Sequence, residues 1–398
     1  MLSTHLDVIK KEVLAWLEKS YVRKINYIFK ILLAKLLILK TRNKIDYNYW
    51  LIGLGDDIYA NNGKVFYEYM IHRHKDIKMY WVCRKDNLKY FENFINKENL
   101  IVRGSIKNYL LALEAKATIY GFSDRDIAPG LFRIFKNHKA IVVNISHGFD
   151  GLKGMPENYY SVLPADIICA ASTYEKNAKI QFCGADKEKV YLTGFARYDM
   201  WPIDEANMLK RPKKIFIMPT WRDWYEEESV VWEDSLLYKK YEKFLKNLDD
   251  LAIIYNLEII CHFHPRMQTF FANPQIQSLS RVKIDYKTSI QELLFQADII
   301  ITDYSSILWD AIYMGKLVFL YWFDYNEYKS KRGLMVEDDF YPYISRNEEI
   351  IIEWIKNCIE NKFYTQVIHE KYFDWHDKSN CDRIYDLIQK KVAEKNSV

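Results

Sequence analysis

From residue 46 onward, short apolar runs alternate with amphipathic stretches of helical length. The runs predict a first series of strands at 49–55, 79–84, 117–122, 140–146, 165–171 and 189–194. They predict a second series at 215–220, 257–264, 282–285, 297–303 and 316–322. Strands that alternate with helices are typical of parallel sheets joined by crossover helices. The pattern therefore predicts an α/β fold with two sheets.

A stretch rich in Pro and Lys at 202–214 separates the two series and predicts a domain boundary. We expect four parts along the chain, which are a basic helical segment, two open α/β domains and a C-terminal helical segment, at 1–45, 46–205, 206–365 and 366–398. Ligands of such domains bind at the carboxyl ends of the strands. The residues directly after each strand are therefore the candidates for function.

The segment at 1–45 carries ten Lys or Arg residues against three Asp or Glu, a net charge of +7. Its apolar stretch at 21–44 is interrupted by Lys30, Lys35 and Lys40, so no run reaches the roughly 18 to 20 apolar residues that span a bilayer. No cleavage site of a secretory signal follows it. We predict a helix lying in the surface of an anionic membrane leaflet. The alternative is a helix packed on the protein or on a partner subunit.

Composition narrows the functional class. The 398 residues are 49% hydrophobic and 28% charged, which suits two folded domains and excludes a disordered chain. The net charge of +4 is concentrated at the N-terminus, whereas a nucleic-acid binder would spread basic residues over its folded part, so we expect no nucleic acid partner. The six cysteines lie far apart without zinc-ligand or disulfide spacing. This usage predicts a protein of the reducing cytoplasm.

The first candidate motif is Ser146-His147-Gly148, which follows an apolar strand and precedes a turn with Gly151, Lys153 and Gly154. A histidine at a strand end is suited to general-base chemistry near neutral pH, and adjacent glycines let a substrate approach the backbone. The alternative is a histidine with a structural role.

The second motif is the sequence CHFHPR at 261–266. Alternation along a strand sends His262 and His264 to one face, as in a metal pair, yet no nearby carboxylate or cysteine completes a ligand set. We therefore predict no metal at this position. His264 with Arg266 could instead meet a phosphate.

The third motif is a buried strand at 297–302 that leads into Asp303-Tyr304-Ser305-Ser306 and a helix with Asp310. Two serines at a helix start offer hydroxyls and free backbone N–H groups to an anion. The alternative is simple N-capping, for which one serine is enough.

Several basic residues are weaker candidates. Arg222 follows the first strand of the second series and could bind phosphate oxygens through its guanidinium fork. Arg197 and Asp199 predict a structural ion pair at the domain junction, and Arg332 predicts either a phosphate contact or a solvated turn. Asp124-Arg125-Asp126 matches the DxD pattern of metal-dependent sugar transferases.

Taken together, the motifs resemble those of the CDP-glycerol glycerophosphotransferase family of bacterial teichoic acid, cell wall and capsule synthesis. They are SHG with its Gly/Lys turn, TGxxRxD, PTWRD, HP after a strand, TDYSSxxxD and a downstream RG, and the resemblance covers residues 46–380. It implies a GT-B architecture, in which two Rossmann-like domains face a cleft and the second binds the nucleotide. It also implies peripheral attachment to the cytoplasmic face of the bacterial cell membrane.

The resemblance also implies roles for single residues. His147 corresponds to the catalytic histidine of the family and His264 to its second essential histidine. Contacts to the substrate would come from the residues Gly148, Lys153, Arg222, Thr302, Asp303, Ser305, Ser306 and Arg332. The reading HGFDGLKG departs from the frequent HGTPLK form, so the polyol and the acceptor stay open.

The implied reaction transfers glycerol phosphate from CDP-glycerol to an undecaprenyl-diphosphate-linked acceptor and releases CMP. No resident cofactor is assigned, and Mg²⁺ is left open. The alternatives are a transferase that uses CDP-ribitol, a GT-B sialyl- or hexosyltransferase of capsule synthesis, and a non-catalytic membrane scaffold.

Overall fold

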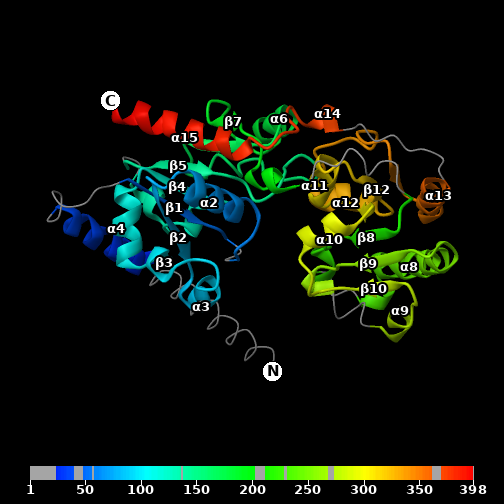
Figure 1. Ribbon diagram of the computed structural model, residues 1–398. Helices are drawn as coiled ribbons and strands as arrows, with labels where there is room; N and C mark the ends of the chain where they lie inside the picture. The colour runs from blue at the N-terminus through cyan, green and yellow to red at the C-terminus, as the bar shows by residue number, and fades with distance from the viewer. Residues whose placement is uncertain are drawn as a thin grey trace, which may run out of the picture.

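The computed structural model describes eight stretches of the chain, residues 24–39, 48–55, 58–135, 138–201, 211–227, 231–267, 273–360 and 369–397. They form two parallel sheets that lie in two halves of the molecule (Figure 1). The strand order is β3-β2-β1-β4-β5-β6-β7 in the first sheet and β10-β9-β8-β11-β12-β13 in the second. In both sheets the order reverses next to the first strand, which is where open α/β folds place ligands.

The first sheet contains β1 (Tyr49–Gly53), β2 (Lys78–Cys83), β3 (Leu100–Val102), β4 (Ala117–Tyr120), β5 (Ile141–Asn144), β6 (Ile167–Ala170) and β7 (Val190–Leu192). The second contains β8 (Lys214–Met218), β9 (Glu258–Cys261), β10 (Val282–Ile284), β11 (Ile299–Thr302), β12 (Leu317–Tyr321) and β13 (Ile344–Ser345). All eleven predicted strands are present, and β3 and β13 were missed.

Helices connect the strands, because parallel neighbours require crossover connections. The longer ones are α2 (Asn61–Arg73), α4 (Ile106–Glu114), α6 (Thr173–Phe182), α8 (Leu236–Tyr255), α12 (Tyr325–Arg332), α13 (Glu348–Ile359) and α15 (Asn380–Asn396). The shorter ones are α3 (Leu88–Phe91), α5 (Leu131–Ile134), α7 (Trp224–Glu227), α9 (Pro274–Gln277), α10 (Ile290–Gln296), α11 (Ile307–Tyr313) and α14 (His369–Tyr372). The central strands β1, β4, β5, β6 and β11 are buried along their whole length, as expected for sheets covered on both faces.

The last helix returns to the first half of the molecule. In Figure 1, α15 lies along the first sheet, although the chain reaches it from the second sheet. Its residues Cys381, Ile384 and Ile388 are buried in one core with Trp50 and Phe66. The chain therefore crosses between the halves twice.

Residues 24–39 form a helix beside α4, and residues 1–23 and 40–45 of the predicted basic segment lie outside the described residues. One side of this helix packs on the first half, where Ile31 and Ala34 are fully buried. Its other side exposes apolar side chains of the residues Ile25, Ile28, Phe29, Leu32, Leu36 and Leu39. Within the described ranges, every helix is too short or too polar to cross a bilayer.

Candidate functional site

The loop after β5 contacts the second half of the molecule at Ser306. A Cβ atom added to Gly148 would lie only 3.3 Å from Ser306 Oγ, so glycine permits the close approach. A small pocket lies between the two halves and is lined by Phe149, Asp150, Gly151, Leu152, Lys153, Met155, Tyr304 and Ser306. The predicted histidine motif and the predicted serine motif thus come together at one place.

Backbone pairing fastens the same loop to the second half. Lys153 and Leu334 form an antiparallel bridge, and the Gly154 N–H donates to Gly333 O at 2.8 Å. A Cβ atom on Gly154 would lie 2.4 Å from the carbonyl oxygen of Arg332, so a larger residue would force the two segments apart. The loop can therefore lie against this turn only because position 154 is glycine.

His147 stands on this loop with an exposed ring. The preceding Ser146 has a φ of +54°, which turns the chain sharply after β5. The imidazole stacks on Phe122, with 3.7 Å between ring centroids and 17° between planes. Although solvent reaches the ring, desolvation by the surrounding protein lowers the pKa of His147 to about 4, against the opposing charge of Asp150. The imidazole is therefore neutral at pH 7 and can accept a proton.

Arg197 ties the backbone of His147 to the second half. Its Nη1 donates to His147 O at 2.9 Å and its Nη2 donates to Asp310 Oδ1 at 2.6 Å. Arg197 is buried, and Asp310 lies on α11, the helix that Ser306 precedes. The Arg197 side chain thus links the loop that carries His147 to α11.

The predicted ion pair between Arg197 and Asp199 is wrong. Asp199 instead accepts the backbone N–H groups of Asn380 at 2.9 Å and Cys381 at 2.7 Å, where α15 begins. Both residues lie on one 3-10 turn (Ala196–Met200), which points side chains two positions apart in different directions.

The two predicted serines differ in their contacts. Ser305 Oγ accepts the N–H of Ile307 at 3.4 Å, which is a weak capping contact. Ser306 stands at the N-cap position of α11, and its side chain makes no capping hydrogen bond. Because Ser306 also lines the pocket, its hydroxyl can meet a ligand.

The residues before the serines hold the turn. Thr302 Oγ1 donates to Met218 O at 2.6 Å. Asp303 Oδ1 accepts the N–H groups of Thr220 at 2.8 Å and of Tyr304 at 2.6 Å. Both side chains are fully buried, so they support the turn at 303–306 from inside the protein and are not expected to contact a ligand.

Arg222 is not placed to bind a phosphate, which corrects the prediction. Its guanidinium is fully buried and pairs with Asp324 at 2.7 Å and with Asp303 at 2.9 Å. The same group lies 5.0 Å from the Tyr304 ring centroid and 4.9 Å from that of Tyr328. Because two carboxylates neutralise its charge, Arg222 has a structural role in the core, next to the turn that carries Ser305 and Ser306.

His264 and Arg332 are both exposed. His264 follows β9 and stacks on Trp221, with 6.0 Å between ring centroids. Arg332 Nη1 pairs with Asp223 at 3.2 Å, and about half of its side chain is exposed. Because β9, β8 and β11 are neighbours, His264 lies on the same edge of the second sheet as Ser306.

The DxD pattern is part of a turn. Asp124 pairs with Arg133 at 3.0 Å, and Asp126 Oδ2 accepts the N–H groups of Phe122 and Ser123. Among the residues that the structure describes, no group of three or more His, Cys, Asp or Glu side chains is arranged for a metal ion.

Sequence reasoning missed three charged residues at the histidine loop, which are Asp150 on the loop and Glu175 and Lys179 behind it. Glu175 and Lys179 are four residues apart on α6, which in a sequence resembles an exposed helical ion pair. The sequence gives one indication that Glu175 and Lys179 are buried. Ala178 lies on the same face of α6, so this face carries an apolar residue beside the two charges.

Comparison with known proteins identifies the family. Residues 35–390 match the family model described as CDP-Glycerol:Poly(glycerophosphate) glycerophosphotransferase. The Minor teichoic acid biosynthesis protein GgaB of Bacillus subtilis (strain 168) is 24% identical over 379 residues, which are 85% of this chain and 39% of that protein. The Teichoic acid poly(ribitol-phosphate) polymerase of Bacillus spizizenii is 26% identical over 220 residues, covering 52% of this chain and 34% of that protein. The chain thus spans less than half the length of these curated relatives.

The solved structure of the Wall Teichoic Acid Polymerase TagF superposes with a TM-score of 0.64 at 18% identity, covering 94% of this chain and 99% of that one. This likeness confirms the predicted GT-B fold. Since the family model covers most of the sequence, the chain belongs to the CDP-glycerol:poly(glycerophosphate) glycerophosphotransferase family.

Proposed function

We propose that this chain transfers glycerol phosphate from CDP-glycerol to a hydroxyl of an undecaprenyl-diphosphate-linked acceptor and releases CMP. The observation that carries the proposal is the close approach of the His147 loop to Ser306 across the two halves. Family membership supports the donor class, and TagF has been solved together with CDPG. A ribitol phosphate donor is the second candidate, because one relative is a poly(ribitol-phosphate) polymerase.

In the proposed reaction, neutral His147 accepts the proton of the acceptor hydroxyl. The hydroxyl oxygen then forms a bond to the β-phosphorus of the donor, while the bond from that phosphorus to CMP breaks and CMP leaves with the electron pair. General-base catalysis of this kind contributes about 10²- to 10⁴-fold to a rate. The lowered pKa keeps His147 in its basic form well below neutral pH.

Lys153 and Ser306 are the residues of the pocket suited to the diphosphate. Burial lowers the pKa of Lys153, and the nearby charge of Arg332 lowers it further. Two cations held close together repel each other, and an anion between them would relieve that repulsion. The Ser306 hydroxyl would add a hydrogen bond as charge develops on the transferred group.

The test of the proposal offers CDP-glycerol, CDP-ribitol, CMP-sialic acid and a UDP-sugar separately, each with a lipid-linked disaccharide. We expect CMP release and a phosphodiester product with CDP-glycerol. Turnover of CDP-ribitol alone would select the second candidate. Turnover of CMP-sialic acid or the UDP-sugar alone would favour the capsule sugar transferases and contradict the proposal.

We also propose that the helix at 24–39 binds the cytoplasmic face of the cell membrane through its exposed apolar side. Replacing Leu32 and Leu36 by aspartate should lower binding to anionic vesicles at least tenfold, because burying each leucine contributes about 1.5 to 3 kcal/mol. Vesicle co-sedimentation measures the loss. Ile254→Asp, at an exposed apolar position on α8, is the control and should bind as wild type. Unchanged binding of the Leu32/Leu36 variant would contradict a membrane role for this helix.

A further inference from the structure

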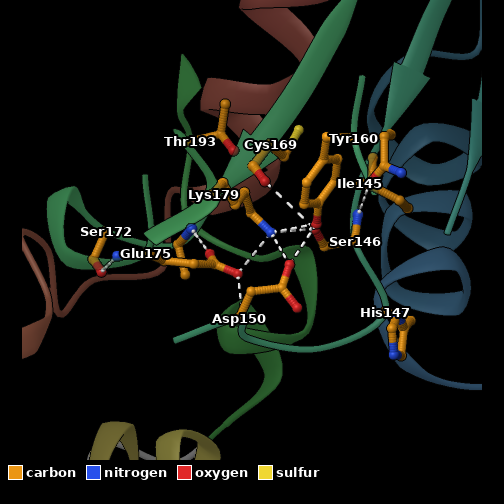
Figure 2. A network of polar contacts seen from close by, with 12 residues as sticks. Ile145, Ser146, His147, Asp150, Tyr160, Cys169, Ser172, Glu175, Lys179 and Thr193 are labelled. Carbon is orange, nitrogen blue, oxygen red and sulfur yellow. Dashed lines mark hydrogen bonds and ion pairs between the residues drawn. The ribbon is translucent and has the colours of Figure 1, made fainter. Parts of the chain in front are cut away.

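A buried cluster of charged and polar side chains lies behind the loop that carries His147 (Figure 2). Helix α6 supplies Glu175 and Lys179, which are one turn apart and fully buried. Tyr160 and Asp150 complete the cluster on the side of the loop. The cluster faces the loop from the first half of the molecule.

Lys179 is the centre of the cluster. Its Nζ donates to Asp150 Oδ2 at 2.6 Å, to the Tyr160 hydroxyl at 2.7 Å and to Ser146 Oγ at 3.2 Å. It also pairs with Glu175 Oε1 at 2.9 Å. The ammonium group therefore touches the residue before His147 and the residue three positions after it.

The Glu175 carboxylate binds the backbone of the loop at Asp150. Its Oε1 accepts the N–H of Asp150 at 2.8 Å and its Oε2 accepts the N–H of Ala171 at 2.6 Å. Both ends of the segment 146–150 are thus fastened to α6. Figure 2 shows His147 pointing away from these contacts, so its ring stays available.

Stability alone does not account for such a cluster. Burying ions is costly unless they are paired, and well-packed apolar residues of similar size are often at least as stabilising. Ser146, whose hydroxyl accepts a hydrogen bond from the cluster, has a φ of +54°, a conformation that is unfavourable for residues other than glycine. Such conformations persist where the surrounding structure holds them, and they are concentrated at functional sites.

We propose that Glu175 and Lys179 are positioning residues, which act through Ser146 and Asp150 to hold His147 in place on the loop that contacts Ser306. This inference rests on the proposed role of His147 as the general base. Neither residue lines the pocket, so neither is expected to touch the substrate.

Glu175→Gln keeps the size of the side chain and removes its charge. We expect kcat to fall about tenfold or more, because displacing a catalytic group by 1 Å can cost as much as a hundredfold. The KM for CDP-glycerol and the Kd for CMP should stay within about twofold, since the nucleotide is expected on the second half. Tyr160→Phe removes one hydroxyl from the cluster without changing its charge and should lower kcat in the same direction. If Glu175→Gln does not fold, the kcat of Tyr160→Phe still tests the positioning role.

Asp249→Asn is the matched control. Asp249 is also buried, in the second half, and accepts the backbone N–H groups of Ser280, Arg281 and Val282. We expect its kcat to stay within about twofold of wild type. A loss equal to that of Glu175→Gln would indicate a general effect of disturbing a buried carboxylate and would overturn the inference.

A second readout does not depend on turnover. NMR of protein labelled with ¹³C in histidine, with the His147 signal assigned through His147→Gln, reports the ring environment directly. We expect this signal to shift or split in Glu175→Gln and Tyr160→Phe and to stay unchanged in Asp249→Asn. An unchanged signal with unchanged kcat in both cluster variants would overturn the inference. If the wild type transferred nothing from any CDP-polyol, the proposed function would fall, while the NMR comparison would still test the positioning.

Discussion

Replacing His147 by alanine is expected to lower kcat by about a thousandfold, within the range that a general base contributes. The methyl side chain cannot accept the proton of the acceptor hydroxyl, so the attacking oxygen stays a weak nucleophile. Binding of the nucleotide should change little, because Lys153 and Ser306 are untouched. Release of CMP measures the rate, and calorimetry with CMP measures the binding.

The control for this variant is His72→Ala, an exposed histidine on α2 that lies outside the pocket. It should keep the wild-type rate. Activity of His147→Ala within about tenfold of wild type would mean that another group takes the proton.

Replacing Arg222 by methionine is expected to lower the free energy of unfolding by about 3 to 5 kcal/mol, the usual cost of removing one partner from a buried ion pair. The variant leaves Asp303 and Asp324 enclosed without a counter-charge. Since Asp303 holds the backbone of the serine turn, the turn should loosen as well. Urea unfolding followed by circular dichroism measures the change.

Arg332→Met is the comparison, because the pair that it breaks with Asp223 is half exposed. Exposed pairs contribute about 0 to 1 kcal/mol, so this variant should unfold close to wild type. Should Arg222→Met keep its stability and lose only its affinity for CMP, Arg222 would be a phosphate ligand after all.

The strands could be predicted from the sequence because buried parallel strands are continuous apolar runs. Strand β13 was missed since its two residues are too few for a recognisable pattern. Strand β3 was missed although its three residues equal the length of β7 and β10, which were predicted. The meeting of the His147 and Ser306 motifs followed from a simple rule, because both stand directly after strands of open sheets.

Charge pairing was the part that the sequence did not show. Arg222 pairs with a carboxylate 102 positions away, and Arg197 with one 113 positions away. An arginine after a strand looks the same in a sequence whether a phosphate or a distant carboxylate faces it. The role of Lys179 was hidden for the same reason, because its partners Asp150 and Tyr160 lie 29 and 19 positions away, in the connection between β5 and β6.

A crystal structure of His147→Ala with intact CDP-glycerol tests the central claim most directly, because the variant should bind the donor without consuming it. We expect the diphosphate between Lys153 and Ser306, with its β-phosphorus next to Gly148 and the cytidine on the second half. A diphosphate bound away from Ser306, on a surface that the loop at 146–154 does not reach, would contradict the account.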